Sequence, residues 1–264
     1  MFKGEKIGLA LSGGGALGAA HIGVIEEMEK AGIRPDFVAG VSAGAVIGLA
    51  YASGGIEAVK KFYEEINFKF FKKNKYLISG GAAGVFGRVE KILRGLIGEK
   101  NFNDLRIPFL CCATNLATGK KEILNSGDCV ASVMASAAYP GVFPAQKING
   151  NFYIDGGVTR NLPAEEVREM GADFIIGSSI YAIDEISAAK AGKMNRFEVA
   201  SRALNILEKE LASFEETRCD FCFKPRNGGF QWFDFLKMEE IVDAGRKNAA
   251  AQIEDILSLF KKYD

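Results

Sequence analysis

Ser42 lies in a short glycine-containing pattern that is typical of a nucleophilic serine. The stretch Gly40-Val41-Ser42-Ala43-Gly44 has the G-x-S-x-G spacing of a nucleophile elbow, a sharp strand-to-helix turn that exposes a serine hydroxyl. A serine at such a turn also lies at a helix N-terminus, where the helix dipole favours a developing alkoxide. Because this motif also occurs by chance in a chain with 31 glycines, its meaning depends on the elements around it.

The proton of Ser42 needs an acceptor, and the chain contains one histidine, His21, upstream of the elbow. His21 lies on the apolar face of a predicted helix, so we interpret it as a packed core residue rather than as a base. That face also carries Leu17, Val24 and Met28. An α/β-hydrolase triad places its histidine after the serine, and none follows Ser42. The base must therefore come from another residue type.

Asp155 is the candidate base. It follows the apolar run 152–154 and begins the tripeptide Asp155-Gly156-Gly157. We expect it at the carboxyl end of a strand, where ligands bind in open parallel sheets. An aspartate with its ordinary pKa near ~3.9 is a weak base, so apolar surroundings or a hydrogen bond to Ser42 must raise its pKa or align it. A β-turn aspartate without catalytic function is the alternative.

Gly13, Gly14, Gly15 and Gly18 form a G-x-G-x-x-G pattern between a predicted strand and a predicted helix. Three interpretations fit: a dinucleotide site, an anion site, and a tight turn without a ligand. A dinucleotide fingerprint requires an acidic residue at the end of the second strand, and this chain has Ser42 there. We therefore favour an oxyanion hole formed by the backbone N–H groups of Gly13 to Gly15.

Strands and helices alternate in the first fifty residues, which predicts a parallel α/β sheet. Short apolar runs predict strands, and apolar positions at helical spacing predict helices. The predicted strands are 6–12, 36–41, 107–114, 152–154, 174–179 and 219–223. The predicted helices are 16–30, 43–52, 88–97, 130–138, 164–170, 196–216 and 236–262. We expect an α/β fold with a parallel-rich central sheet flanked by helices.

Residues 62–98 interrupt this alternation, and we interpret them as an insertion or lid. The stretch 62–76 mixes aromatic and lysine side chains, and the glycine-rich stretch 80–87 is predicted to be a loop. Aromatics and lysines together suit a bilayer interface, although a solvated lysine face or a lid explains them as well. Peripheral membrane contact would use Phe68, Phe70, Phe71, Lys72 and Lys73.

Length and composition favour one soluble domain spanning 1–264. With 33 basic and 33 acidic residues, no overall field would hold the protein on nucleic acid or on an anionic membrane, so any membrane contact must be local. The longest apolar stretch, 45–52, is far shorter than the ~20 residues of a membrane span, and the N-terminal apolar run is too short for a signal peptide. Five cysteines, an odd number, favour a reducing compartment. We therefore expect a cytoplasmic protein.

Cys219 and Cys222 form a C-x-x-C pair, which is a fragment of many zinc sites. The pair lacks a second pair and a nearby histidine, and it alternates with Phe221 and Phe223 as strand residues would. We therefore predict no metal and no cofactor.

Together these motifs resemble those of the patatin-like phospholipases. The resemblance extends to I-P-F-L-C-C-A-T-N-L-A-T-G at 107–119, A-S-A-A-Y-P-G-V-F-P at 135–144 and Y-I-D-G-G-V-T-R-N-L-P at 153–163. The segment D-F-L-K-M-E-E-I-V-D-A-G-R-K-N-A-A is similar to the closing helix of that family. The resemblance implies a patatin-like Ser-Asp hydrolase fold over the whole chain.

The resemblance also implies roles for particular residues. Ser42 would be the nucleophile, Asp155 the base of a dyad without histidine, and Gly13 to Gly15 the oxyanion hole. Gly18, Gly40, Gly44, Gly156 and Gly157 would support these motifs. The substrate would be a phospholipid, a lysophospholipid or a related ester. Leu17 stands where many members have an arginine, and it is the one hint of an alternative, a lipid-binding or scaffold protein that retains the elbow.

Overall fold

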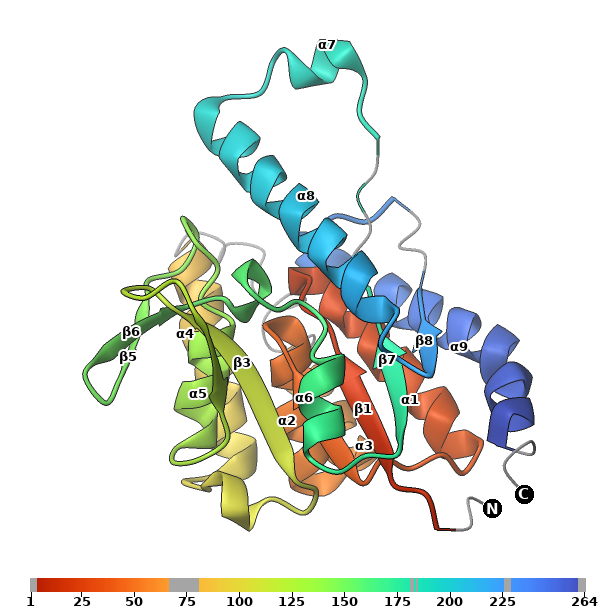
Figure 1. Ribbon diagram of the computed structural model, residues 1–264. Coiled ribbons are helices and arrows are strands. Elements are labelled where there is room, and N and C mark those ends of the chain that lie inside the picture. The colour runs from red at the N-terminus through yellow and green to blue at the C-terminus, as the bar shows by residue number, and fades with distance from the viewer. Residues whose placement is uncertain (1–3, 67–80, 181–182, 184, 226–228, 261–264) are drawn as a thin grey trace.

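The computed structural model describes residues 4–66, 81–180, 183, 185–225 and 229–260. The described chain forms one mixed sheet of eight strands between layers of helices (Figure 1). Strand pairing follows the order β5-β6-β3-β2-β1-β7-β8, and β4 pairs with β3. The strands are β1 (Ile7–Leu11), β2 (Phe37–Gly40), β3 (Phe109–Asn115), β4 (Lys121–Leu124), β5 (Gln146–Ile148), β6 (Asn151–Ile154), β7 (Phe174–Ser178) and β8 (Phe221–Phe223).

The described helices differ in length from one to about six turns. They are α1 (Ala19–Lys30), α2 (Ala43–Gly54), α3 (Ile56–Ile66), α4 (Gly81–Ile97), α5 (Cys129–Ser136), α6 (Ala164–Glu169), α7 (Ala188–Ala191), α8 (Arg196–Glu216) and α9 (Met238–Phe260). In Figure 1, α7 and α8 lie at the top of the molecule, above the carboxyl ends of the parallel strands. The pocket described below opens at this end.

The parallel strands β8, β7, β1, β2 and β3 separate two apolar cores. Along β1, Ile7, Leu9 and Leu11 belong to the larger core, which also contains residues of α1, α2 and α9. Ala10 belongs to the smaller core against α6. Side chains alternate between the faces of a strand, so a continuous apolar run is expected where both faces are buried. This explains why 6–12 is recognisable as a strand.

The helices α1 and α9 pack closely at one glycine on each. A Cβ atom on Gly23 would lie 2.2 Å from the carbonyl oxygen of Val242, and one on Gly245 would lie 2.1 Å from that of Ala20. Neither position has room for a side chain. The closing helix therefore lies directly on α1 and covers the large core.

Two strands meet end to end along one edge of β3. Cys111 of β3 pairs with Gly40 of β2 on one edge and with β4 on the other. Thr114, further along β3, pairs with β4 on that same second edge and with Ile154 of β6 on the first. The strands β2 and β6 therefore share one edge of β3. Because β2 is parallel to β3 and β6 is antiparallel to it, the carboxyl ends of β2 and β6 face each other. The residues that follow these strands are therefore neighbours.

The predicted loop at 80–87 is wrong, because α4 begins at Gly81. Phe86, Leu93 and Ile97 are buried in the large core and share one face of this helix. Glycine lowers helix propensity by only about 1 kcal/mol per residue, and packing of an amphipathic face outweighs that cost here.

The antiparallel part of the sheet also differs from expectation. The strands β4 and β5 were outside the predicted set, and β6 is antiparallel to β3 rather than part of an open parallel sheet.

The segment predicted to contact membranes, with Phe68, Phe70, Phe71, Lys72 and Lys73, lies outside the described residues. Among the described helices, none has both the length and the apolar composition that a membrane span requires.

Candidate active site

Ser42 occupies the turn between β2 and α2 in a strained backbone conformation. Its φ is 52° and its ψ is −121°, a region that costs a non-glycine residue about 1–3 kcal/mol. The backbone N–H of Ser42 donates to Ser136 Oγ at 2.9 Å, and Ser136 Oγ donates to the carbonyl oxygen of Cys112 at 2.7 Å. The serine turn is therefore fixed to β3 through α5.

The glycines around the elbow are required by close backbone contacts. A Cβ atom on Gly40 would lie 2.5 Å from the carbonyl oxygen of Gly44. One on Gly44 would lie 2.4 Å from that of Leu11, and one on Gly18 would lie 2.5 Å from Ala43 Cβ. Gly18, Gly40 and Gly44, which were predicted to support the motifs, thus lie where α2 packs closely against the sheet and the glycine loop.

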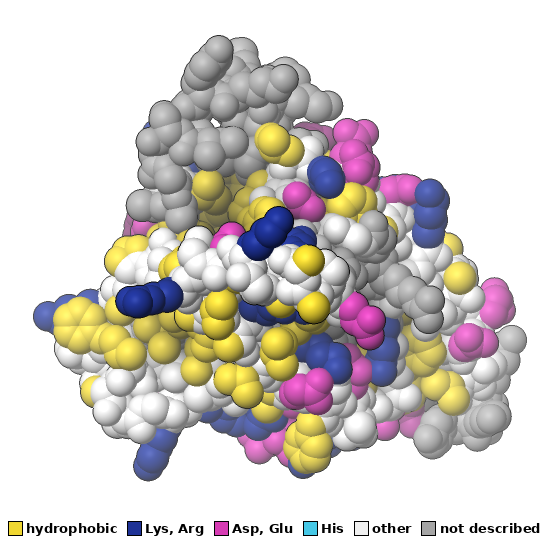
Figure 2. Space-filling model, turned by 90° about the horizontal axis from the view of Figure 1, so that it is seen from above, with side chains coloured by type: hydrophobic (Ala, Val, Ile, Leu, Met, Phe, Trp, Pro, Cys, Tyr) yellow, Lys and Arg dark blue, Asp and Glu magenta, His cyan; other side chains and the backbone are white. Residues whose placement is uncertain are grey.

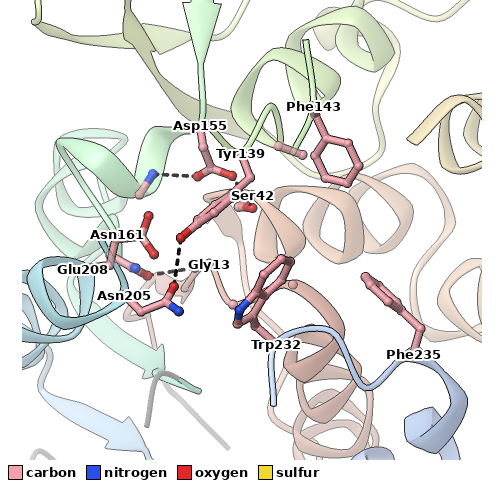
Figure 3. A pocket seen from close by; sticks show the side chains of 14 residues that line it. Gly13, Ser42, Tyr139, Phe143, Asp155, Asn161, Asn205, Glu208, Trp232 and Phe235 are labelled. Atoms are coloured by element: carbon pink, nitrogen blue, oxygen red, sulfur yellow. Dashed lines mark hydrogen bonds between the residues drawn. The ribbon is translucent and has the colours of Figure 1, made fainter. Parts of the chain in front are cut away.

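Asp155 lies directly beside Ser42. The Ser42 hydroxyl donates to Asp155 Oδ2 at 2.6 Å, and the N–H of Gly157 donates to Asp155 Oδ1 at 2.8 Å (Figure 3). The aspartate is 1% exposed. Burial raises its pKa to about 6, although the hydrogen bonds from Ser42 and Gly157 oppose this shift.

Asp155 meets both conditions that the sequence analysis set for a base, because its carboxylate is aligned with the Ser42 hydroxyl and its pKa is higher than usual. A carboxylate with a pKa near 6 is unprotonated at neutral pH and holds a proton better than an ordinary aspartate. The close turn depends on Gly156, where a Cβ atom would lie 2.1 Å from the carbonyl oxygen of Cys112. Ser42 and Asp155 can therefore exchange a proton directly.

The glycine loop lies next to Ser42, but its three members differ in availability. The N–H of Gly13 donates to Asn161 Oδ1 at 2.9 Å and to the Asn161 carbonyl oxygen at 3.2 Å, so it does not fit the predicted role as an anion donor in this conformation. Gly14 and Gly15, with φ of 153° and 59°, have N–H groups without an acceptor among the described residues. They remain the candidates for binding an oxyanion.

Asn161 in turn depends on a buried carboxylate of α8. Glu215 Oε2 accepts hydrogen bonds from the N–H groups of Asn161 at 3.0 Å and Leu162 at 2.6 Å. Glu215 also pairs with Arg160 at 3.0 Å, and burial raises its pKa to about 7. Arg160 pairs further with Glu165 at 3.0 Å. This network holds the segment that carries both Asp155 and the partner of Gly13.

Two pockets meet at Ser42. The first, of about 460 Å³, contains the glycine loop and Asp155, with polar side chains on one side and Phe143 and Phe235 on the other (Figure 3). The second, of about 660 Å³, is mainly apolar and lies between α2, α3, α4 and α5. Its wall includes Val46, Ile47, Phe62, Phe86, Val89 and Met134.

Three polar residues of the first pocket, Asn161, Asn205 and Glu208, are not among the residues predicted from sequence. Asn161 lies six residues after Asp155 in the segment D-G-G-V-T-R-N, and this closeness is the signal that points to it. Asn205 and Glu208 come from α8, far along the chain, and no local pattern marks them. Tyr139, another residue of this pocket, contacts α8, because its hydroxyl donates to Asn205 Oδ1 at 2.9 Å.

His21 lies in the core, as predicted. It is fully buried, with Nδ1 2.8 Å from Ser178 Oγ and Nε2 2.9 Å from the carbonyl oxygen of Ser12. Burial lowers its pKa to about 4. Leu17 is also buried in the core, at 3% exposure.

Cys219 and Cys222 both approach Gly177, where a Cβ atom would lie 2.6 Å and 3.0 Å from their sulfur atoms. Burial and the contact with Cys222 raise the pKa of Cys219, which opposes the thiolate form that metals bind. Within the described part of the chain, no three His, Cys, Asp or Glu side chains are placed to hold a metal ion.

The fold and the site together define an α/β protein whose serine, at a strand-to-helix turn, is hydrogen-bonded to a buried aspartate. The family model Patatin-like phospholipase matches residues 9–168, which is more than half of the chain. The chain therefore belongs to the patatin-like phospholipase family.

Curated relatives are much longer than this chain. The patatin-like phospholipase domain-containing protein ZK370.4 of Caenorhabditis elegans is 27% identical over 98% of this chain and 21% of that protein. Lysophospholipase NTE1 of Coccidioides immitis is 29% identical over 92% of this chain and 17% of that protein. The chain thus spans about a fifth of the length of these relatives.

Solved structures show the same fold at low identity. VipD from Legionella pneumophila has a TM-score of 0.58 and 16% identity, covering 95% of this chain and 67% of that chain. Human GIVD cytosolic phospholipase A2, in complex with methyl γ-linolenyl fluorophosphonate, has a TM-score of 0.53 and 10% identity, covering 98% of this chain and 59% of that chain.

Proposed function

We propose that this protein hydrolyses carboxyl esters of lipids, with Ser42 as the nucleophile and Asp155 as the general base. The observation that carries the proposal is the 2.6 Å hydrogen bond from Ser42 Oγ to a buried carboxylate at the junction of two pockets. Membership of the patatin-like phospholipase family supports the reaction class. Names such as lysophospholipase among the relatives support lipid esters as substrates.

The reaction has two stages. In the first, Asp155 Oδ2 accepts the hydroxyl proton as Ser42 Oγ bonds to the ester carbonyl carbon. The carbonyl oxygen becomes an oxyanion, and the N–H groups of Gly14 and Gly15 stabilise it; one such donor typically contributes ~2.7–4 kcal/mol. The carbon–oxygen bond to the alcohol then breaks, and the alcohol leaves with the proton from Asp155.

In the second stage, water hydrolyses the acyl-enzyme. Asp155 accepts a proton from the water as its oxygen attacks the acyl carbon, and the same backbone donors stabilise the second oxyanion. Ser42 regains its proton when the fatty acid leaves. The apolar pocket fits the acyl chain, because its wall offers aliphatic and aromatic side chains next to Ser42.

A fluorophosphonate probe and an ester substrate together test this proposal. Ser42→Ala should abolish labelling and lower kcat by 10³-fold or more, while Asp155→Asn should lower kcat by about 10²–10⁴-fold because an amide accepts no proton. Ser53→Ala, at the other end of α2, is the matched control and should retain both activities. Labelling of Ser42→Ala at the normal rate would contradict the proposal, as would normal ester turnover by Asp155→Asn.

The same probe separates a hydrolase from a lipid-binding scaffold that retains the elbow. A scaffold would bind lipid without labelling or releasing fatty acid. Release of fatty acid from a panel of phospholipid, lysophospholipid, monoacylglycerol and p-nitrophenyl esters would then identify the substrate class.

A further inference from the structure

The helix α8 has its polar face toward the protein and its apolar face toward the outside. Glu208 and Glu215 are 4% and 0% exposed, although glutamate is rarely buried. A surface helix normally buries its apolar side chains and exposes its charged ones. On the opposite side of α8, four large apolar side chains are 43–66% exposed instead: Val199, Ile206, Leu207 and Phe214. Phe197, in the first turn of α8, lies on the same side of the helix as Glu208 and Glu215 and is 53% exposed.

The inward polar face of α8 contacts the site around Ser42. Glu215 holds the segment that contains Asn161, and Glu208 and Asn205 line the pocket of Ser42. The outward apolar face contributes nothing to the two buried cores. Covering one such side chain is worth about 1.5–3 kcal/mol, so this face favours contact with an apolar partner.

Exposed apolar side chains also surround the mouth of the Ser42 pocket. A Cβ atom on Gly141 would lie 3.1 Å from the ring of Phe197, which places this ring beside the turn that carries Tyr139 and Phe143 of the pocket wall. On another part of the mouth, Phe233 and Leu236 are 57% and 62% exposed, next in sequence to pocket residues Trp232 and Phe235. The outward apolar side chains of α8, together with Phe197, Phe233 and Leu236 around the pocket mouth, are called the α8 face below.

Positive charge accompanies the N-terminal part of this surface. The segment 187–207 contains four basic residues and one acidic residue, whereas the rest of α8, 208–216, contains one basic and four acidic residues. Lys190, Lys193 and Arg196 are exposed, and none of them forms an ion pair with another described residue. Figure 2, which looks down on this end of the molecule, shows hydrophobic and basic side chains interspersed.

We propose that the α8 face is a docking surface for an anionic lipid bilayer. Aromatic and aliphatic side chains flanked by lysine and arginine are the combination that an anionic bilayer interface attracts. The exposed charges of Lys190, Lys193 and Arg196 favour such a surface over a second copy of this neutral chain. α8 lies C-terminal to the residues that the family model matches, 9–168. Docking would place the mouth of the Ser42 pocket against the bilayer.

Binding is measurable without turnover, because Trp232 is the chain's one tryptophan and lies at the pocket mouth. Its fluorescence should shift to the blue when the purified protein is titrated with phosphatidylcholine vesicles containing 30% phosphatidylglycerol. Cosedimentation with the same vesicles gives an independent affinity. We expect binding at least tenfold weaker to pure phosphatidylcholine, and weaker binding to the anionic vesicles as salt rises.

Three double variants separate the contributions. Phe197→Asp with Leu207→Asp should weaken binding to anionic vesicles by tenfold or more, and Lys190→Glu with Lys193→Glu should remove the preference for them. Lys30→Glu with Arg34→Glu makes the same charge change at the opposite end of the sheet and should bind like the natural protein. Thermal melts check that each variant is folded. All exchanged side chains are exposed.

Several outcomes would overturn the proposal. Vesicle binding that is absent, or equal in the Phe197→Asp, Leu207→Asp variant and the natural protein, would exclude this surface as the lipid contact. A dimer in light scattering that the same variant dissociates, without vesicle binding, would assign the face to a second copy. Ser42→Ala should bind vesicles normally, so failure of ester hydrolysis and failure of docking are distinguishable.

Discussion

At the scale of single residues, the central feature is an aspartate whose surroundings oppose its charge. Asp155 is buried beside Ser42, and the two hydrogen bonds that it accepts do not fully offset the loss of water. A carboxylate with a raised pKa serves as a base where an exposed aspartate would not. This explains how a serine elbow can function without a histidine after it in the chain.

The pKa of Asp155 predicts the pH dependence of ester hydrolysis. The base must be unprotonated, so kcat/KM should be level above pH 7 and fall about tenfold per pH unit below pH 6. A pH–rate profile measured with a non-ionising ester checks this expectation. Glu215 is another buried carboxyl near the site, and its pKa is about 7, so the profile should be repeated with Glu215→Gln. A midpoint near 6 in both proteins assigns the fall to Asp155, and a rate that still rises tenfold between pH 7 and 9 would contradict it.

The residues that sequence alone can identify are those that belong to local motifs. Ser42, Asp155 and the glycines around them each lie in a short pattern with its own physical reason. Glu208 and Glu215 of α8 contribute to the same site, although each lies more than fifty residues after Asp155 in the chain. Their spacing within α8 resembles that of ordinary solvent-exposed charges, and only the fold shows that they are buried.

At the scale of elements, the elbow depends on how closely α2 approaches the end of β1. Gly44 lies in the first turn of α2, where a Cβ atom would meet the carbonyl oxygens of Leu11 and Ser12 at 2.4 and 2.5 Å. Backbone atoms cannot rotate away as a side chain can. The second glycine of the G-x-S-x-G motif is therefore required for packing of α2, in addition to the chemical role of the serine.

The same substitution at two glycines should have opposite effects on stability. Gly44→Ala should lower the free energy of unfolding by about 2–3 kcal/mol through overpacking. Gly95→Ala, on the exposed side of α4 with nothing within 4 Å of the new Cβ, should raise it by about 0.5–1 kcal/mol because alanine favours helix. Urea denaturation of both variants measures the difference. Equal stability of the two would show that α2 can move away from β1.

The parallel strands were predictable because their apolar runs are long and buried on both faces, whereas β4, β5 and the first two turns of α4 were missed for separate reasons. The strands β4 and β5 are short, and each has intermediate or exposed side chains, so no apolar run marks them. In α4 the glycines obscured apolar positions at helical spacing. The direction of β6 depends on its pairing with β3, which is a long-range contact that local sequence does not specify.

At the scale of the whole molecule, the two pockets that meet at Ser42 belong to different parts of the fold. The polar pocket involves α8 and the segments around Asp155, while the apolar pocket lies between α2, α3, α4 and α5. We expect the alcohol to lie in the first and the acyl chain in the second. Selectivity for the acyl chain should then depend on side chains that do not touch the polar pocket.

A bulky side chain in the apolar pocket should shorten the acyl chain that the protein accepts. Each buried methylene contributes about 0.8 kcal/mol, or about fourfold in kcat/KM, so excluding three methylenes costs about 50-fold. Val89→Trp should therefore reduce kcat/KM for dodecanoyl esters strongly and that for butanoyl esters less than twofold. Lys91→Trp, on the exposed side of the same helix, is the control. Equal losses on both esters would place the acyl chain elsewhere.

The end-to-end meeting of β2 and β6 makes the separation of Ser42 and Asp155 a matter of strand register. A slip of β6 by one residue along β3 would displace Asp155 by about 3.3 Å and turn its side chain to the other face of the sheet. The chain segments that join these strands do not determine that separation. They could lengthen, shorten or acquire new domains during evolution while the serine and the carboxylate stayed within one hydrogen bond of each other.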